Sequence, residues 1–208
     1  YSYDFSKKSE LLKTMPARFN AKNLVVQQKF ATSKDGTKVP YFIVHKKGMK
    51  PTGNNPTLLY GYGGFAISLT PRYKALVGKH WLEKGGVYVV ANIRGGGEYG
   101  PSWHQAALKE NRQRAYDDFI SVAEDLISTK VTQPQKLAIR GGSNGGLLVG
   151  AVMTQRPDLF GAVLCWVPLL DMIRYSQLLA GASWIGEYGD PKESKYRRII
   201  MKYSPYQN

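Results

Sequence analysis

A serine placed between glycines is the feature that most constrains the fold of this chain. The run Ile139–Leu148 reads Ile-Arg-Gly-Gly-Ser-Asn-Gly-Gly-Leu-Leu and contains the pattern G-x-S-x-G centred on Ser143. A short strand-like run at 136–139 precedes the serine, and an apolar run at 147–153 follows it with no proline before Pro157. This order predicts a strand, a sharp turn and a helix, with the serine hydroxyl projecting from the turn. The flanking residues must be small because such a turn brings backbone segments close together.

Strand and helix patterns alternate through the rest of the chain. Two strand-like runs, 24–32 and 38–45, are joined by Asp35-Gly36, which is a strong hairpin signal. The later strand-like runs are almost continuously apolar, as is typical of a parallel sheet covered on both faces by helices. We predict strands at 24–32, 38–45, 57–60, 87–93, 136–140 and 162–167, and helices at 71–84, 102–109, 116–128 and 147–153.

The position of Ser143 in this order narrows the fold class. The serine follows the fifth of six predicted strands, where the α/β-hydrolase fold carries its nucleophile. We therefore predict an α/β-hydrolase fold, a mostly parallel sheet with helices on both faces. No strand pattern follows Val167, so the last strands of the fold are expected to be absent. Residues 1–20 lack periodicity and are interpreted as a tail, and 21–208 are interpreted as a truncated α/β-hydrolase domain.

Composition argues against several other classes of protein. No apolar run approaches the roughly 20 residues of a membrane span. The formal net charge is +14, from 29 basic and 15 acidic residues, which raises a nucleic-acid-binding hypothesis. The basic residues are scattered, however, with no zinc spacing or RNP-like motif beside them, which favours a solvated basic surface. We expect no nucleic acid, no membrane, no metal and no cofactor as partners.

The single cysteine bears on both packing and location. Cys165 lies in the apolar run 162–167 and is expected to be a core thiol. One cysteine allows no intrachain disulfide, which agrees with a cytoplasmic location. The chain does not begin with methionine, so a periplasmic or secreted location stays open.

The chemistry of a serine nucleophile requires further groups. A histidine oriented by a carboxylate usually removes the proton of the serine hydroxyl. All three histidines, His45, His80 and His104, precede Ser143, whereas the order in this fold is serine, acid, histidine. The acidic residues after the serine come too early for the acid position: Asp158, Asp171, Glu187, Asp190 and Glu193. We therefore expect the aspartate and histidine of the triad beyond Asn208.

The chain does contain candidates for the hydrogen-bond donors that stabilise the negative oxygen of an acyl-transfer intermediate. The backbone N–H of Asn144, directly after the serine, is one candidate. The second is expected from the glycine-rich loop 60–65, and either a backbone N–H or the Tyr62 hydroxyl fits this role.

Three segments carry a family resemblance: Gly61–Phe65, Asn92–Gly100 and Gly141–Leu148. Together they resemble the catalytic domain of the prolyl oligopeptidases, which are S9 serine peptidases, and the resemblance runs from about Leu24 to the end of the chain. It implies Ser143 as nucleophile, with the Tyr62 side chain and the Asn144 N–H as the oxyanion hole. It also implies an apolar substrate-binding pocket made by Phe65, Leu169, Trp184 and Tyr188.

The resemblance implies a function as well. Members hydrolyse short peptides on the C-terminal side of proline through an acyl-serine intermediate. The expected partners are short proline-containing peptides and the rest of the same enzyme, an N-terminal β-propeller from which residues 1–20 would lead, and a C-terminal catalytic segment. Three alternatives stay open: an oligopeptidase B-like enzyme, an esterase-type serine hydrolase and an inactive α/β binding scaffold. Oligopeptidase B is less similar, because its elbow usually has alanine after the serine and its pocket tryptophan lies between glutamates, whereas Ser183 and Ile185 flank Trp184 here.

Overall fold

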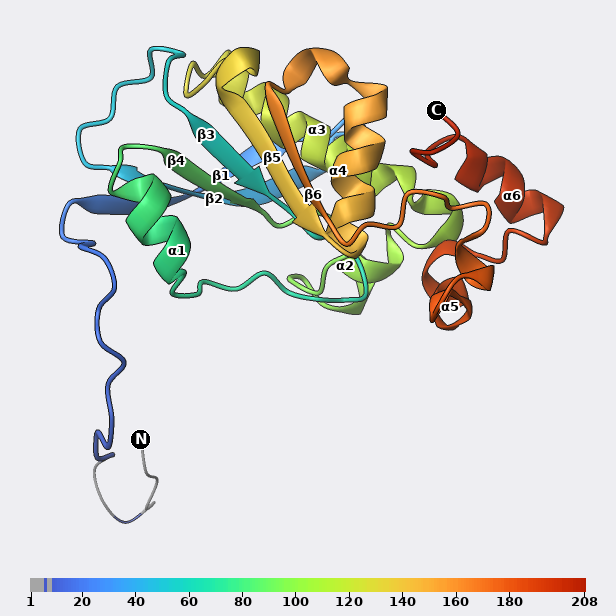
Figure 1. Cartoon of the computed structure of the whole chain (residues 1–208), viewed down its shortest axis with the longest axis horizontal. Coiled ribbons are helices and arrows are strands. Elements are labelled where there is room, and N and C mark those ends of the chain that lie inside the picture. Colours follow the sequence, from blue (N-terminus) through green and yellow to red (C-terminus); the bar gives the residue numbers. More distant parts are fainter. Residues whose placement is uncertain (1–5, 7–8) are drawn as a thin grey trace.

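A six-stranded mixed sheet forms the centre of the chain (Figure 1). The computed structural model describes residue 6 and residues 9–208. The strands lie in the order β1-β2-β4-β3-β5-β6. Their bounds are Leu24–Thr32 for β1, Lys38–Lys46 for β2, Thr57–Tyr60 for β3, Val87–Ala91 for β4, Leu137–Gly142 for β5 and Ala162–Trp166 for β6.

The strand directions confirm the predicted fold class. β3 pairs in parallel with both β4 and β5, and β5 pairs in parallel with β6. The predicted hairpin is formed by β1 and β2, and it adds two antiparallel strands next to β4. Ser143 follows β5, the fifth strand in the chain, so its turn lies at the carboxyl end of a central parallel strand, where open α/β sheets present their sites.

Helices cover both faces of this sheet (Figure 1). Successive side chains of a strand point to opposite faces. Leu59 and Val89 belong to the larger core, which also contains the buried side chains of α3 and α4. Leu58 and Tyr88, their neighbours in sequence, pack on the other face with Leu82. The α-helices are α1 (Ala75–Val77), α2 (Pro101–Gln105), α3 (Gln113–Ser128), α4 (Asn144–Gln155), α5 (Ile185–Tyr188) and α6 (Ser194–Met201).

Two predicted helices are shorter than expected. In place of a helix over 71–84, α1 is a single turn continued by a π-helix at Gly78–Leu82. The preceding residues do not join it because Tyr73 stacks on Phe19, with ring centroids 5.1 Å apart, and Lys74 has non-helical backbone angles. The helix expected at 102–109 ends at Gln105, and a separate 3-10 turn follows at Lys109–Asn111.

The edge strand β6 corrects a further expectation. Its side chains alternate between exposed and half-buried, so Cys165 is only half-buried. The Cys165 thiol contacts the Gly146 carbonyl at 3.3 Å, which places it against α4 at the margin of the main core, on which it packs. Burial still raises the pKa of this thiol.

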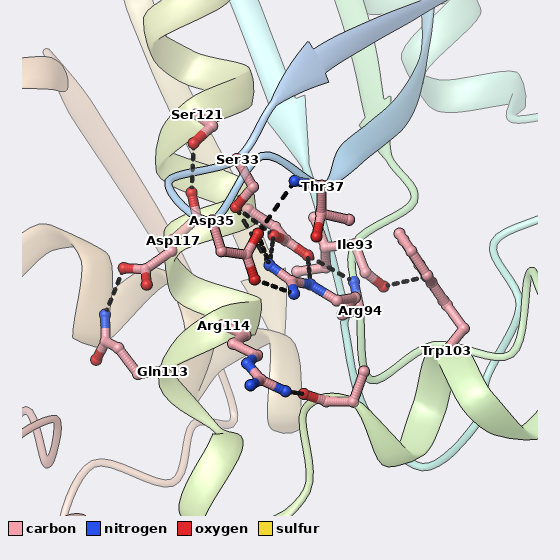
Figure 2. Close-up of polar contacts among 12 residues, drawn as sticks. Ser33, Asp35, Thr37, Ile93, Arg94, Trp103, Gln113, Arg114, Asp117 and Ser121 are labelled. Carbon is pink, nitrogen blue, oxygen red and sulfur yellow. Dashed lines mark hydrogen bonds and ion pairs between the residues drawn. The ribbon is translucent and has the colours of Figure 1, made fainter.

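The opening hairpin is fastened to α3 by a buried arginine (Figure 2). Arg94 follows β4, and its guanidinium bonds to Asp118 on α3 and to Asp35 in the hairpin turn. Ser33 donates to the same Asp118 carboxylate at 2.6 Å. These contacts fix the end of the hairpin against the helix that covers the sheet.

The predicted tail, 1–20, is described only in part. Residues 1–5 and 7–8 lie outside the described residues, and those described between 6 and 20 form no helix or extended strand. Among the helices that the structure does describe, none combines the length and the apolar character needed to cross a bilayer.

Candidate active site

The turn after β5 holds Ser143 in an exposed position with an unusual backbone. Its φ is 57° and its ψ is −120°, a region that L-residues seldom occupy and that costs of order 1–3 kcal/mol. Glycines on either side are sterically required. A Cβ on Gly141 would lie 1.9 Å from the Gly145 carbonyl oxygen, and a Cβ on Gly145 would lie 2.8 Å from that of Gly61. The G-x-S-x-G pattern is therefore explained by close backbone packing.

Two hydrogen-bond donors accompany the serine hydroxyl. Asn144 is the first residue of α4, so its backbone N–H has no acceptor within the helix and lies at the positive end of the helix dipole. The half-buried Tyr62 side chain lines the same cavity as Ser143. Burial raises the pKa of Tyr62 and outweighs the opposing effect of the neighbouring Ser143 hydroxyl. The phenol therefore keeps its proton at neutral pH and remains a donor.

The loop that carries Tyr62 lies directly on the Asn144 side chain. The Asn144 Nδ2 donates to the Tyr62 carbonyl at 2.6 Å. A Cβ on Gly64 would come within 2.5 Å of the same Nδ2, which explains the glycine. Gly63 and Phe65 have φ values of 65° and 55°, so the loop turns sharply at both positions. This turn brings the Phe65 ring back toward Ser143.

An apolar cavity of about 250 Å³ opens beside Ser143. Phe65 and Tyr188 form part of its wall and pack edge to face, with ring centroids 5.9 Å apart. The structure thus gathers six of the seven predicted site residues around one hollow, and Asn144 lies buried beside it. Ile67 is an additional lining residue that we did not predict. The full lining is Tyr62, Phe65, Ile67, Ser143, Leu169, Trp184 and Tyr188.

A buried polar network next to the cavity was also missed from the sequence. Arg112 is fully buried, and its Nη1 donates to Glu187 at 3.0 Å while its Nη2 donates to the Asn144 Oδ1 at 2.5 Å. The Glu187 carboxylate also accepts from the Phe65 backbone N–H at 3.0 Å and contacts the His104 Nε2 at 2.8 Å. Arg112 and Glu187 lie 75 residues apart in the sequence, so no local pattern indicates that they pair.

The three histidines lie as follows. His104 contacts Glu187, His45 contacts the Lys46 carbonyl at 2.9 Å, and His80 is exposed on the π-helix beside α1. No hydrogen bond between Ser143 and any of them is found in the described part of the chain. The assignment of the triad base therefore stays a prediction. Within residues 9–208, no group of three or more histidine, cysteine or acidic side chains is placed to hold a metal ion.

Comparison with known proteins assigns this chain to a protein family. Residues 75–208 match the family model described as the prolyl oligopeptidase family, Peptidase_S9. The chain belongs to this family, and the α/β-hydrolase fold predicted for it is confirmed.

Particular relatives agree with this assignment. Over 96% of its length the chain is 58% identical to the uncharacterized peptidase y4nA of Sinorhizobium fredii, and over 98% it is 48% identical to a prolyl endopeptidase of Elizabethkingia miricola. The solved structure of a post-proline cleaving enzyme from Rickettsia typhi superposes on 96% of the chain with a TM-score of 0.90 and 52% identity. The chain spans 27% and 29% of the two curated relatives and 28% of the solved chain.

Proposed function

We propose that this chain carries the nucleophile, the oxyanion hole and the proline pocket of a serine peptidase that cleaves short peptides on the C-terminal side of proline. The observation that supports it best is the position of Ser143. It is exposed at a strained turn and lines an apolar cavity together with Tyr62. The family membership and the names of the relatives point to the same activity.

The chemistry proposed for these residues is acyl transfer. The Ser143 Oγ attacks the carbonyl carbon of the scissile bond, and the carbonyl oxygen becomes negative. The Asn144 N–H and the Tyr62 hydroxyl donate to that oxygen. The C–N bond then breaks, the amine leaves with the proton that the Ser143 hydroxyl gave up, and water hydrolyses the serine ester to the acid and the free hydroxyl. An aspartate and a histidine from outside residues 1–208 are proposed to supply the acid–base groups, as the family resemblance implies.

The cavity chemistry suits a proline ring. Phe65, Leu169 and Trp184 offer apolar or aromatic surface, and the aromatic faces can stack on the flat pyrrolidine. Proline brings no backbone N–H into the pocket, so the apolar wall leaves no donor unsatisfied. A lysine or arginine substrate would need a carboxylate there, and none lines the cavity in the described part of the chain.

A chromogenic peptide ending in Gly-Pro tests this proposal in the natural-length protein. Ser143→Ala is expected to lower kcat by several orders of magnitude, since loss of a triad nucleophile has effects of that size. Turnover that is unchanged in this variant would contradict the proposal. Gly-Ala and Gly-Arg analogues serve as matched substrates. Cleavage of Gly-Arg would favour the oligopeptidase B-like alternative, and a simple aryl ester cleaved without preference for proline would favour an esterase.

A further inference from the structure

We propose that Arg112 is a positioning residue for the oxyanion hole, acting through the side chain of Asn144. The inference rests on the proposed function, because it concerns the donors that would stabilise the acyl-transfer intermediate. Arg112 is fully buried and does not itself line the cavity, but its guanidinium lies over the ring of Tyr188, a wall residue, 5.2 Å from the ring centroid. Its effect would pass through two groups that hold the walls of the site.

The first step of the argument is the bonding of the Asn144 side chain. Its Oδ1 accepts from the Arg112 Nη2 at 2.5 Å and from the Tyr188 hydroxyl at 2.7 Å. Its Nδ2 donates to the Tyr62 carbonyl at 2.6 Å. The fully buried Asn144 amide therefore bonds at the same time to the loop that carries Tyr62, to Tyr188 on α5 and to Arg112. Because Asn144 also carries the backbone donor next to Ser143, fixing its side chain fixes the direction of that N–H.

The second step is the carboxylate of Glu187. It accepts from the other arm of the Arg112 guanidinium and from the Phe65 backbone N–H, both at 3.0 Å. Glu187 lies on α5, next to Tyr188, which lines the cavity. Arg112 thus joins the start of α4, the loop that carries Tyr62 and Phe65, and the helix that carries the pocket wall. These are the three parts whose relative placement sets the distance from the donors to the reacting carbonyl.

The third step is the choice of arginine. A guanidinium presents several N–H groups in a rigid plane and can bond to two acceptors in fixed directions, whereas a lysine is a single flexible point charge. Burying an ion pair is a poor route to stability, because desolvation of both charges offsets their attraction. A fully buried Arg112 beside a site is therefore better explained by geometry than by stability alone.

The experiment compares Arg112→Met and Arg112→Lys with Arg94→Lys as the matched control, all in the natural-length protein. Arg94 is the other buried arginine, and its side chain bonds only to Ser33, Asp35 and Asp118 among the described residues. Four quantities are measured: the melting temperature, kcat and KM on the Gly-Pro substrate, and the rate at which a fluorophosphonate probe labels Ser143. The probe also requires the oxyanion hole but not the proline pocket.

We expect Arg112→Met to lower kcat about 10- to 100-fold with a much smaller change in KM, the size expected when catalytic donors shift by a fraction of an ångström. Labelling should slow in parallel. Arg112→Lys should recover part of the melting temperature, through Glu187, without recovering kcat. Arg94→Lys should lower the melting temperature and leave kcat and labelling unchanged.

Several results would overturn the proposal. They are a folded Arg112→Met variant with normal kcat and labelling, recovery of kcat together with stability in Arg112→Lys, or an equal loss of kcat in Arg94→Lys. If Arg112→Met does not fold, the lysine variant carries the test alone. A wild-type protein that labels with the probe but leaves Gly-Pro uncut would refute the proposed function, and the labelling rates would still decide the role of Arg112.

Discussion

Two buried arginines bind carboxylates in this molecule, and they differ in what their partners touch. Arg94 faces two acids, Asp118 on α3 and Asp35 in the hairpin turn. Figure 2 shows Asp35 beside Arg94. Its Nη2 and Nε bond to the two oxygens of Asp118 at 2.6 and 2.9 Å, the bidentate geometry that suits a guanidinium. Arg112 bonds instead to one acid, Glu187, and to one neutral amide, Asn144.

From this difference we expect Arg94 to stabilise the fold and Arg112 to position the groups around Ser143. The partners of Arg94 lie on the hairpin and on α3, and none of them lines the cavity beside Ser143. The partners of Arg112 are each bonded to, or adjacent to, a cavity residue. Removal of either arginine leaves a buried carboxylate, so both should reduce stability. Only removal of Arg112 should also change the chemistry at Ser143.

The largest expected effect on stability tests the Arg94 half of this comparison. Arg94→Met leaves Asp118, whose side chain is fully buried, without its opposite charge. Breaking a buried ion pair by removing one partner costs about 3–5 kcal/mol. We expect a loss of that order in the free energy of unfolding, measured by urea denaturation, with kcat unchanged at a temperature where the variant is folded.

The double variant Arg94→Met/Asp118→Leu is the control for this prediction, since it removes both charges and leaves an apolar pair. It should recover much of the lost stability. A double variant that is less stable than Arg94→Met would show that the pair itself, and not the orphaned carboxylate, dominates.

Smaller effects are expected from two tyrosine variants, one on the Arg112 side of the molecule and one on the Arg94 side. Tyr188→Phe removes the hydroxyl that donates to Asn144, and Tyr41→Phe removes one that donates to Asp125 on α3, at 2.5 Å. Both rings are fully buried, and each variant loses one hydrogen bond, to the buried Asn144 in one case and to the half-buried Asp125 in the other, worth roughly 0.5–3 kcal/mol. We expect both melting temperatures to fall. Only Tyr188→Phe should lower kcat on the Gly-Pro substrate, by at most about tenfold.

Equal kcat values in the two tyrosine variants would weaken the view that the Arg112 region sets the geometry of the site. A fall in kcat for Tyr41→Phe would weaken the view that the Arg94 side of the molecule serves only the fold.

The predictable parts of the molecule are those whose cause is local in sequence. The hairpin is indicated by Asp35-Gly36, and the observed β1 and β2 agree with the predicted runs to within one residue. The elbow is indicated by glycines whose steric need is visible in the backbone contacts of Gly141 and Gly145. The pocket residues came from the family resemblance, and the structure brings Phe65 and Trp184 together although they are far apart in the chain.

The parts that could not be predicted depend on contacts between distant segments. The helical spacing at 71–84 is continuous, but α1 begins only at Ala75, because Tyr73 stacks on Phe19 and Lys74 has non-helical backbone angles. The pairing of Arg112 with Glu187 joins an irregular turn to a four-residue helix, and neither has a pattern that marks it as buried. Ile67 reaches the cavity only because the backbone turns at positive φ at Phe65 and at Ala66.

The smallest expected effect concerns Asp35, the more exposed of the two acids that bond to Arg94. The hydrogen bond from Arg94 holds the pKa of Asp35 well below its usual range, and the Thr37 contacts add to this while burial opposes it. A folded-state pKa below the unfolded value of about 3.9 means that Asp35 stabilises the fold above that pH. The contribution is lost as the pH falls toward the folded-state pKa. Because the side chain is 44% exposed, it should amount to about 0.2–1 kcal/mol.

Asp35→Asn tests this contribution by urea denaturation at several pH values. The difference in unfolding free energy between the wild type and the variant should be constant from pH 7 to about pH 5 and should shrink below about pH 4. High salt should reduce it as well, because the pair is partly open to solvent. A difference that grows in acid would mean that Asp35 is protonated more readily in the fold than in the unfolded chain. Its bond to Arg94 would then not hold the hairpin, and the Asp118 arm alone would account for the fastening of β1 and β2 to α3.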